Sequence, residues 1–288
     1  MKLKAKALLD LTKPTLVLMA LVTTLLGYFL AEGRITPEFK LWMTLLATVL
    51  TYGGSAVLNH YIERDRDSKM FRTQNRPLPL GVIRPGSALV YGLLLIGVGV
   101  FLMGFYVNGL ACVALAATAV LYVLVYTPLK TKSPLNTLVG SLPGAMPPLI
   151  GWMAATGSFQ KQALLPFLIL FAWQFPHFYA IAWIYREDYA RGGFKMFPVV
   201  EEKGKWTFRQ VLFFTLLLIY FSLIPGLWGY QGVIYIVGVM IMGAVMLALC
   251  FEFMLTHSNR DAKRLMRATL FYLPILFLLT VFDPGGGP

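Results

Sequence analysis

Three side chains with oxygen ligands recur every four residues at the start of a polar segment: Asn59, Glu63 and Asp67. On a helix with 3.6 residues per turn, this spacing places all three on one face, one turn apart. Mg²⁺ takes a few carboxylate or carbonyl oxygens from a protein and keeps its other positions for water and substrate phosphate. The row therefore predicts a magnesium site for a diphosphate. A solvated charge cluster beside a membrane is the alternative interpretation.

Basic residues follow this row along the chain. Arg72 and Arg76 are again four residues apart, and guanidinium groups bind phosphate oxygens in a bidentate manner. Asp65 and Lys69 lie among these charges and are predicted to contact the substrate. Acids followed by bases favour chemistry on a diphosphate whose departing charge is neutralised. The predicted catalytic residues of this segment are Asn59, Glu63, Asp67, Arg72 and Arg76.

A second polar segment, at about 185–207, again mixes acids with bases. Asp188 is predicted to take part in catalysis as a ligand of a second metal ion, with Glu187 as a further candidate. Taken alone, the segment is typical of an ordinary basic loop beside a membrane, but its placement opposite a similar cluster favours a functional role. The residues predicted to bind phosphate here are Arg186, Arg191 and Lys195.

The rest of the chain is strongly apolar. Of 288 residues, 58% are hydrophobic and 13% are charged, and the mean hydropathy is +0.69, which is too apolar for a soluble domain. A helix needs about 20 residues to cross a bilayer. The two longest stretches without a charged residue must therefore each hold two helices. The sequence thus predicts an all-α membrane protein with nine transmembrane helices. The expected helices are 14–31, 40–60, 87–106, 108–127, 135–156, 163–184, 208–228, 231–253 and 268–283.

The basic residues orient these helices. With a cytoplasmic N-terminus, all of the 25 lysines and arginines except Arg34, Lys40 and Lys161 fall on the cytoplasmic side. The positive-inside rule therefore predicts an N-terminus inside the cell and a C-terminus outside it. The same topology accounts for the net charge of +12, so no nucleic-acid partner is expected.

This topology also locates the predicted chemistry. Both polar segments, at about 61–86 and 185–207, fall on the cytoplasmic side, so the active site is expected to face the cytoplasm from the cell membrane. No linker or low-complexity stretch divides the chain. Residues 1–288 are therefore predicted to form a single transmembrane domain.

Four stretches carry motifs of a known family. They are Asn59 to Pro77, Tyr126 to Asn136, the sequence GAMPPLIGW at 144–152, and WQFPHF at 173–178 continuing to Pro198. These motifs resemble the haem O synthases, or protohaem IX farnesyltransferases, a branch of the UbiA superfamily of intramembrane prenyltransferases. The resemblance covers nearly the whole chain. It implies a UbiA-type prenyltransferase fold, with nine helices around a central cavity.

The same resemblance implies a reaction. Farnesyl diphosphate is held by Mg²⁺ at the cytoplasmic end, and haem B is the acceptor substrate rather than a cofactor. The farnesyl group is transferred to a haem vinyl group with addition of water, which gives haem O and diphosphate. Two positions depart from the superfamily pattern: Asp188 has no second aspartate four residues away, and Glu63 stands where many relatives have aspartate.

Further candidate contacts lie inside or at the ends of helices. His177, in the sixth expected helix, is a polar ring at a depth where such groups face the interior. It is predicted either to contact haem, as an axial ligand or otherwise, or to brace a proline-kinked helix. Tyr126, Lys130 and Asn136 are predicted to bind diphosphate or a haem propionate, with helix capping as the alternative.

Other functions fit less of the sequence. A related prenyltransferase acting on a quinone precursor or a chlorin would share the acid row but should lack the Pro-His-Phe segment. A secondary transporter would show inverted repeats and charges at the membrane midplane, whereas the charges here lie at one rim. An assembly subunit of a terminal oxidase would not need the acid row. Beyond the substrates and the lipid bilayer, haem A synthase or a terminal-oxidase assembly is the partner class left open.

Overall fold

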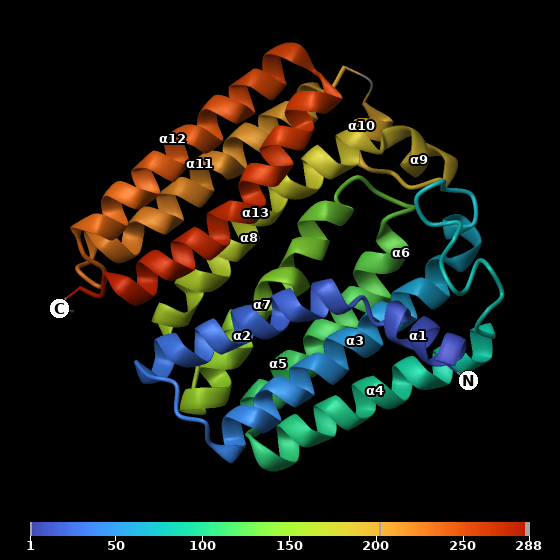
Figure 1. Ribbon diagram of the computed structural model, residues 1–288, viewed down its shortest axis with the longest axis horizontal. Coiled ribbons are helices and arrows are strands. Elements are labelled where there is room, and N and C mark those ends of the chain that lie inside the picture. Colours follow the sequence, from blue (N-terminus) through green and yellow to red (C-terminus); the bar gives the residue numbers. More distant parts are fainter. Residues whose placement is uncertain (1, 202, 286–288) are drawn as a thin grey trace. The chain divides into compact units, whose positions relative to one another are not determined.

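The computed structural model describes residues 2–201 and 203–285, which form helices joined by loops, the longest of them at 68–84 (Figure 1). Within these residues, nine helices are long and apolar enough to cross a membrane, and no strand occurs. The prediction of an all-α membrane protein with nine spans is confirmed. The spans are α2 (Pro14–Glu32), α3 (Phe39–Asp67), α4 (Pro85–Tyr106), α5 to α6 (Gly109–Leu129), α7 (Asn136–Thr156), η2 with α8 (Lys161–Ile184), α11 (Lys205–Leu227), α12 (Val233–Thr256) and α13 (Asn259–Phe282).

The helices gather into two compact units. The first holds the described residues up to Leu164 together with Asp188–Lys195, and the second holds Leu165–Glu187 together with the described residues from Met196 onward. The short segment Asp188–Lys195 thus packs with the N-terminal half of the chain. The expectation of a single domain over the whole chain stays a prediction.

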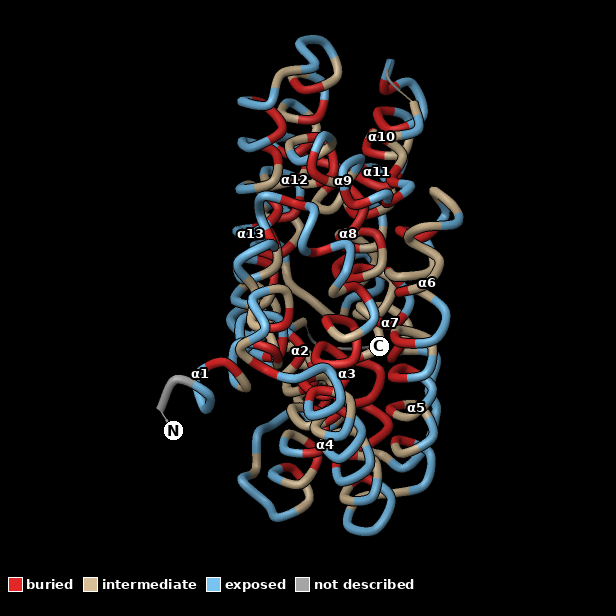
Figure 2. Tube along the Cα trace, turned by 90° about the vertical axis from the view of Figure 1, so that its right-hand side faces the viewer, coloured by how far each residue is buried: buried red, intermediate tan, exposed pale blue. Residues whose placement is uncertain are grey.

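In the first unit, α3 packs along α4 and α2 packs along α7. The helices α3 and α7 are its most buried spans, as the long red stretches of Figure 2 show. A Cβ atom on Gly27 of α2 would lie 1.9 Å from the Pro148 carbonyl oxygen, and one on Gly151 of α7 would lie 2.0 Å from the Thr24 carbonyl oxygen. Backbones this close require glycine, which is how helices commonly associate in membranes.

In the second unit, α11 packs on α12 and α12 packs on α13, and aromatic side chains fill the core together with those of α8. Two buried tyrosines keep their hydroxyl groups satisfied in this apolar surrounding. Tyr235 donates a hydrogen bond to the Ser222 carbonyl oxygen at 2.8 Å, and Tyr272 donates to Ser222 Oγ at 3.0 Å. A buried hydroxyl group without a partner would destabilise the core, so Ser222 is the shared acceptor of the bundle.

The helices extend past the boundaries expected from apolar windows. α3 continues to Asp67 instead of ending at residue 60, because a helix can carry charged side chains once it leaves the hydrocarbon. α13 begins at Asn259, nine residues before the expected 268, because the Ser258 hydroxyl caps it by accepting from the Asp261 N–H group. The sequence patterns also missed three short helices: α1 (Lys2–Leu11), α9 (Arg186–Arg191) and α10 (Phe197–Val200).

The fourth span is interrupted near its C-terminal end, which the sequence did not indicate. After α5 (Gly109–Val120), the chain forms a π-helix at Leu121–Tyr126 and a last turn, α6 (Thr127–Leu129). Such wider turns are rare and occur often at functional sites. This one sets the direction of Tyr126, Thr127 and Lys130, which reappear in the candidate active site.

The contact between α2 and α7 gives a stability test. Gly151→Ala should lower the free energy of unfolding by about 1–3 kcal/mol, because the added methyl group forces two backbones apart. Gly97→Ala is the matched control, since a Cβ on that α4 residue meets no atom within 4 Å. The measurement is thermal unfolding in detergent. Equal melting temperatures for the two variants would contradict the close packing.

Candidate active site

The predicted row of oxygen ligands lies on one buried face of α3. The exposed fraction is 0% for Asn59, 5% for Glu63 and 0% for Asp67. Because α3 runs unbroken to Asp67, the three side chains follow one another at one-turn intervals along its axis. The expected helical spacing is confirmed. Burial also shows that the row is more than a solvated cluster of charges.

Asn59 is held from two sides. Lys13 Nζ donates to Asn59 Oδ1 at 2.7 Å, and Asn59 Nδ2 donates to Thr127 Oγ1 at 3.1 Å. Lys13 precedes α2 and has a left-handed backbone with φ of 52°. Burial, then the positive charges of Arg76 and Lys130, lower the pKa of the Lys13 ammonium to about 7. The sequence indicated Lys13 only as part of the charge distribution that sets the topology. Its position directly before the first span is the signal that could have placed it in the site.

Glu63 forms an ion pair with Lys130, at 2.8 Å between Oε1 and Nζ. The Lys130 ammonium also lies 4.6 Å from the centroid of the Tyr126 ring. Burial opposes the charge on Lys130, but the neighbouring Glu63, Tyr126 and Tyr122 outweigh it and raise the Lys130 pKa. The ammonium is therefore firmly protonated. Tyr126 and Lys130 thus lie together, and their predicted contact with diphosphate or a haem propionate stays a prediction.

Asp67 is paired through one oxygen and open at the other. Arg76 Nη1 lies 2.8 Å from Asp67 Oδ2. Asp67 Oδ1 is buried and has no hydrogen-bond partner among the described residues, and the same holds for both ring nitrogens of His60. His60 Nδ1 lies 3.8 Å from Asp67 Oδ2. A buried carboxylate oxygen without a partner is costly, so Oδ1 marks a position suited to a cation.

The row fits a magnesium ion that also binds a diphosphate. It offers two carboxylates and an amide oxygen, which are hard oxygen ligands, and it leaves coordination positions for water and phosphate. Within the described residues, no cluster of three or more histidine, cysteine, aspartate or glutamate side chains forms a complete metal cage. The row alone can therefore supply only part of the coordination shell of a metal ion. Phosphate oxygens of a substrate would supply further ligands.

Asp188 ties the two polar segments together. Its Oδ1 accepts from the Phe71 N–H group at 3.0 Å and from the Arg191 guanidinium group, and its Oδ2 accepts from the Arg72 N–H group at 3.1 Å. Burial acts to raise the Asp188 pKa, but these hydrogen bonds outweigh it and lower the pKa. Both oxygens are engaged, so a metal-ligand role for Asp188 stays a prediction that the geometry does not support.

Other contacts join the same two segments. Arg72 Nη2 donates to the Tyr189 hydroxyl at 3.0 Å, and Arg66 Nη1 donates to the Gly192 carbonyl oxygen at 3.1 Å. Gly193 has φ of 70°, a backbone region that favours glycine, and a Cβ there would lie 2.9 Å from Arg66 Nη1. The two polar segments therefore lie next to each other, as predicted, and hydrogen bonds between their residues hold them together.

The remaining predicted contacts do not join the row. Asp65, Lys69 and Lys195 have exposed side chains, and Asp65 is on the opposite side of α3 from Glu63. Asn136 Nδ2 donates to the carbonyl oxygens of Ser133 and Lys195, at 2.7 and 2.9 Å, so Asn136 braces the loop. The substrate contacts predicted for these residues stay predictions.

Two further predicted residues belong to the second unit. Arg186 donates to the Trp183 carbonyl oxygen and to Asn259 Oδ1, both at 3.0 Å. His177, in α8, is partly buried, and its Nδ1 lies 2.7 Å from Thr269 Oγ1 of α13. The structure thus gives His177 a fixed orientation.

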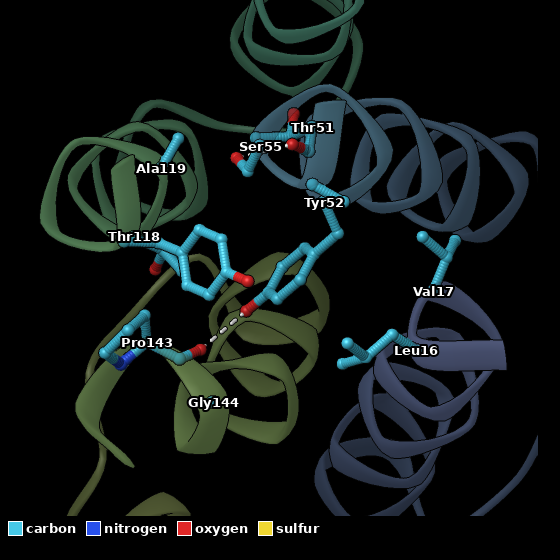
Figure 3. A pocket seen from close by; sticks show the side chains of 11 residues that line it. Leu16, Val17, Thr51, Tyr52, Ser55, Thr118, Ala119, Pro143 and Gly144 are labelled. Atoms are coloured by element: carbon cyan, nitrogen blue, oxygen red, sulfur yellow. Dashed lines mark hydrogen bonds between the residues drawn. The ribbon is translucent and has the colours of Figure 1, made fainter. Parts of the chain in front are cut away.

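An apolar cavity in the first unit begins one turn along α3 from Asn59 (Figure 3). Tyr52 crosses it, and its hydroxyl donates to the Pro143 carbonyl oxygen at 3.0 Å. The family resemblance implied a central cavity, but it did not indicate these lining residues, which come from separate helices. It is lined by Leu16, Val17, Thr51, Tyr52, Ser55, Ala56, Thr118, Ala119, Tyr122, Pro143 and Gly144.

Comparison with known proteins decides the family. The model of the UbiA prenyltransferase family matches residues 20–277. The chain belongs to the UbiA prenyltransferase family. A relative from Solibacter usitatus, named protoheme IX farnesyltransferase, is 38% identical, and the match covers 96% of this chain and 98% of the relative.

Solved structures agree on the UbiA fold. A digeranylgeranylglyceryl phosphate synthase matches with a TM-score of 0.81 and 17% identity over 98% of both chains. A UbiA homologue from Archaeoglobus fulgidus, bound to DMAPP and Mg²⁺, matches with a TM-score of 0.66 and 14% identity over 96% of this chain and 99% of that one. The expected UbiA-type fold is confirmed.

The loop contacts of Asp188 can be tested by proteolysis. Asp188→Asn replaces a carboxylate that accepts two backbone N–H groups and should loosen the segment 68–84. Losing a hydrogen bond to a charged group is worth about 1.5–3 kcal/mol, so tryptic cleavage at Lys69 and Arg72 should become roughly tenfold faster. Glu187→Gln makes the same chemical change on the exposed neighbour and should have no effect. Unchanged cleavage of Asp188→Asn would refute the bracing role.

Proposed function

We propose that this chain transfers the farnesyl group of farnesyl diphosphate to a vinyl group of haem B, with addition of water, to give haem O and diphosphate. The family membership and the nearly full-length relative named protoheme IX farnesyltransferase support this function. The main structural observation in support is the α3 row, in which each oxygen ligand is buried and contacts a separate basic side chain.

The cations of the row are placed to receive a diphosphate. Lys13, Lys130 and Arg76 each hold one row side chain. When a diphosphate enters, these cations can turn to its oxygens, and the row oxygens then become free for a metal ion. Bound Mg²⁺ would be held by Asn59, Glu63 and Asp67 and would neutralise negative charge on the diphosphate. The Archaeoglobus relative binds its prenyl diphosphate together with Mg²⁺.

Departure of the diphosphate is the step that these residues accelerate. The bond between C1 of the farnesyl group and the diphosphate oxygen breaks, and the diphosphate keeps the electron pair. Lys13, Lys130 and Arg76 stabilise the negative charge that develops on it, which is usually the largest catalytic term. Arg72, which lies beside Tyr189 on the same segment as Arg76, is positioned to assist as the diphosphate is released.

The farnesyl chain needs an apolar site that excludes water. The cavity around Tyr52 reaches Ser55, about 6 Å along the helix axis from Asn59, which is the rise of four residues. Its walls protect an allylic cation from hydrolysis before the acceptor reacts. The vinyl carbon then bonds to C1, and water adds to the neighbouring carbon and loses a proton. His177 contacts the haem in this proposal.

The reaction is tested directly with purified protein in nanodiscs, given haem B, farnesyl diphosphate and Mg²⁺. Mass analysis should detect the hydroxyethylfarnesyl haem. Asp67→Asn should lower the rate at least about 100-fold, because it removes a buried charge from the diphosphate site. Asp10→Asn, at an exposed aspartate of α1, should retain activity. Near-normal haem O formation by Asp67→Asn would remove the metal-site assignment.

The proposed location is the cell membrane, with the active site facing the cytoplasm. Ser68→Cys and Ser158→Cys place single thiols on opposite predicted sides, in a chain with Cys112 and Cys250 replaced by serine. In intact cells, an impermeant thiol reagent should label Cys at position 158 and should reach position 68 only after lysis. The reverse pattern would overturn the topology.

A further inference from the structure

A hydrogen-bonded cluster in the second unit connects α8 with α13. Trp173 Nε1 donates to the Thr269 carbonyl oxygen at 2.7 Å, and His177 Nδ1 lies 2.7 Å from Thr269 Oγ1. Thr269 Oγ1 in turn donates to the Met266 carbonyl oxygen at 2.6 Å. Thr269 is fully buried. One threonine therefore contacts both polar rings that α8 presents to α13.

The hydrogen-bond network around Thr269 favours a proton on Nδ1 of His177. The Thr269 hydroxyl group has one hydrogen, and the 2.6 Å contact with the Met266 carbonyl oxygen requires that hydrogen between the two oxygens. The Thr269 oxygen is then an acceptor toward His177, so Nδ1 must carry a hydrogen and donate it. In a neutral ring, Nε2 then has the free lone pair. The opposite tautomer would leave two oxygens in contact with no hydrogen between them.

The orientation of the ring is fixed as well as its tautomer. Trp173 stacks on His177, with ring centroids 4.8 Å apart and an angle of 15° between the planes. One face of the imidazole is thus covered and its Nδ1 edge is engaged by Thr269. The hydrogen bonds of the ring within the described residues, to Thr269 Oγ1 and to the backbone of Met266, both come from α13.

We propose that Thr269 is a positioning residue that presents Nε2 of His177 to the iron of haem B. Histidine ligands of metals commonly donate their other ring N–H to a fixed acceptor, which sets the tautomer and the direction of the ligating nitrogen. Thr269, braced by the Met266 carbonyl group, is that acceptor here. The inference rests on the proposed function, because it requires haem as the substrate that His177 contacts.

A purely structural role is the alternative, in which the cluster only holds α8 against α13. The two roles differ in their spectroscopic consequences. If the cluster only braces helices, replacing Thr269 lowers thermal stability and leaves the absorption spectrum of bound haem unchanged. If Thr269 presents Nε2, its replacement alters the ligation of the iron, which the Soret and visible bands report.

The test is titration of the purified full-length protein with ferric haem B, followed by absorption spectroscopy. Thr269→Val removes the hydroxyl group with little change of shape, and it should weaken haem binding about tenfold and shift the Soret band. Thr269→Ser keeps the acceptor and should restore both. Thr280→Val is the matched control, because Thr280 also donates to a carbonyl oxygen of α13, that of Leu276, and does not contact His177.

Haem affinity and spectrum equal to wild type in Thr269→Val would overturn the proposal, whatever its thermal stability. An unchanged spectrum in His177→Ala would also overturn it, because the ring would then not ligate iron. The nanodisc assay for haem O separates these outcomes from failure of the proposed function, since haem O can form without a histidine ligand. Binding of farnesyl diphosphate with Mg²⁺ should stay normal in every variant of this series.

Discussion

Two carboxylates and an amide are buried along one face of α3, and each must be neutralised or hydrogen-bonded where it lies. Removing a carboxylate from water costs several kcal/mol unless a partner compensates for it. The partners come from three distant parts of the chain: Lys13 before α2, Lys130 after the π-helix, and Arg76 in the segment that follows α3. The elements around α3 therefore each bring a basic side chain into contact with one residue of the row.

In the proposed function, the same compensation would prepare the site for its substrate. The acidic and basic side chains in contact form a nearly neutral network. In the proposed function, the diphosphate would bind the basic side chains and the metal ion would bind the acidic ones. Asp67 Oδ1, buried without a partner in the described structure, is the visible sign that the network is incomplete by itself. The apolar cavity beside Tyr52 follows directly along α3, so in the proposed function the diphosphate and the prenyl chain of one substrate would both lie along this helix.

The sequence predicted the features that depend on residue spacing and on the apolar environment of the membrane. Apolar windows located the nine spans, and the four-residue spacing located the row on a helix face. It could not reveal partners joined only by folding, such as Lys13 with Asn59 or the cavity walls from separate helices. It also suggested metal ligation for Asp188, whose carboxylate instead binds backbone N–H groups of the arginine segment. Side-chain type alone does not distinguish those two uses.

The central claim is that metal and diphosphate depend on each other at the α3 row. The most direct measurement is the melting temperature of the purified protein with Mg²⁺ alone, farnesyl diphosphate alone, and both together. We expect the two together to stabilise the protein by more than the sum of their separate effects, and Asp67→Asn to lose this excess. Stabilisation by Mg²⁺ alone as large as that by both would contradict the claim.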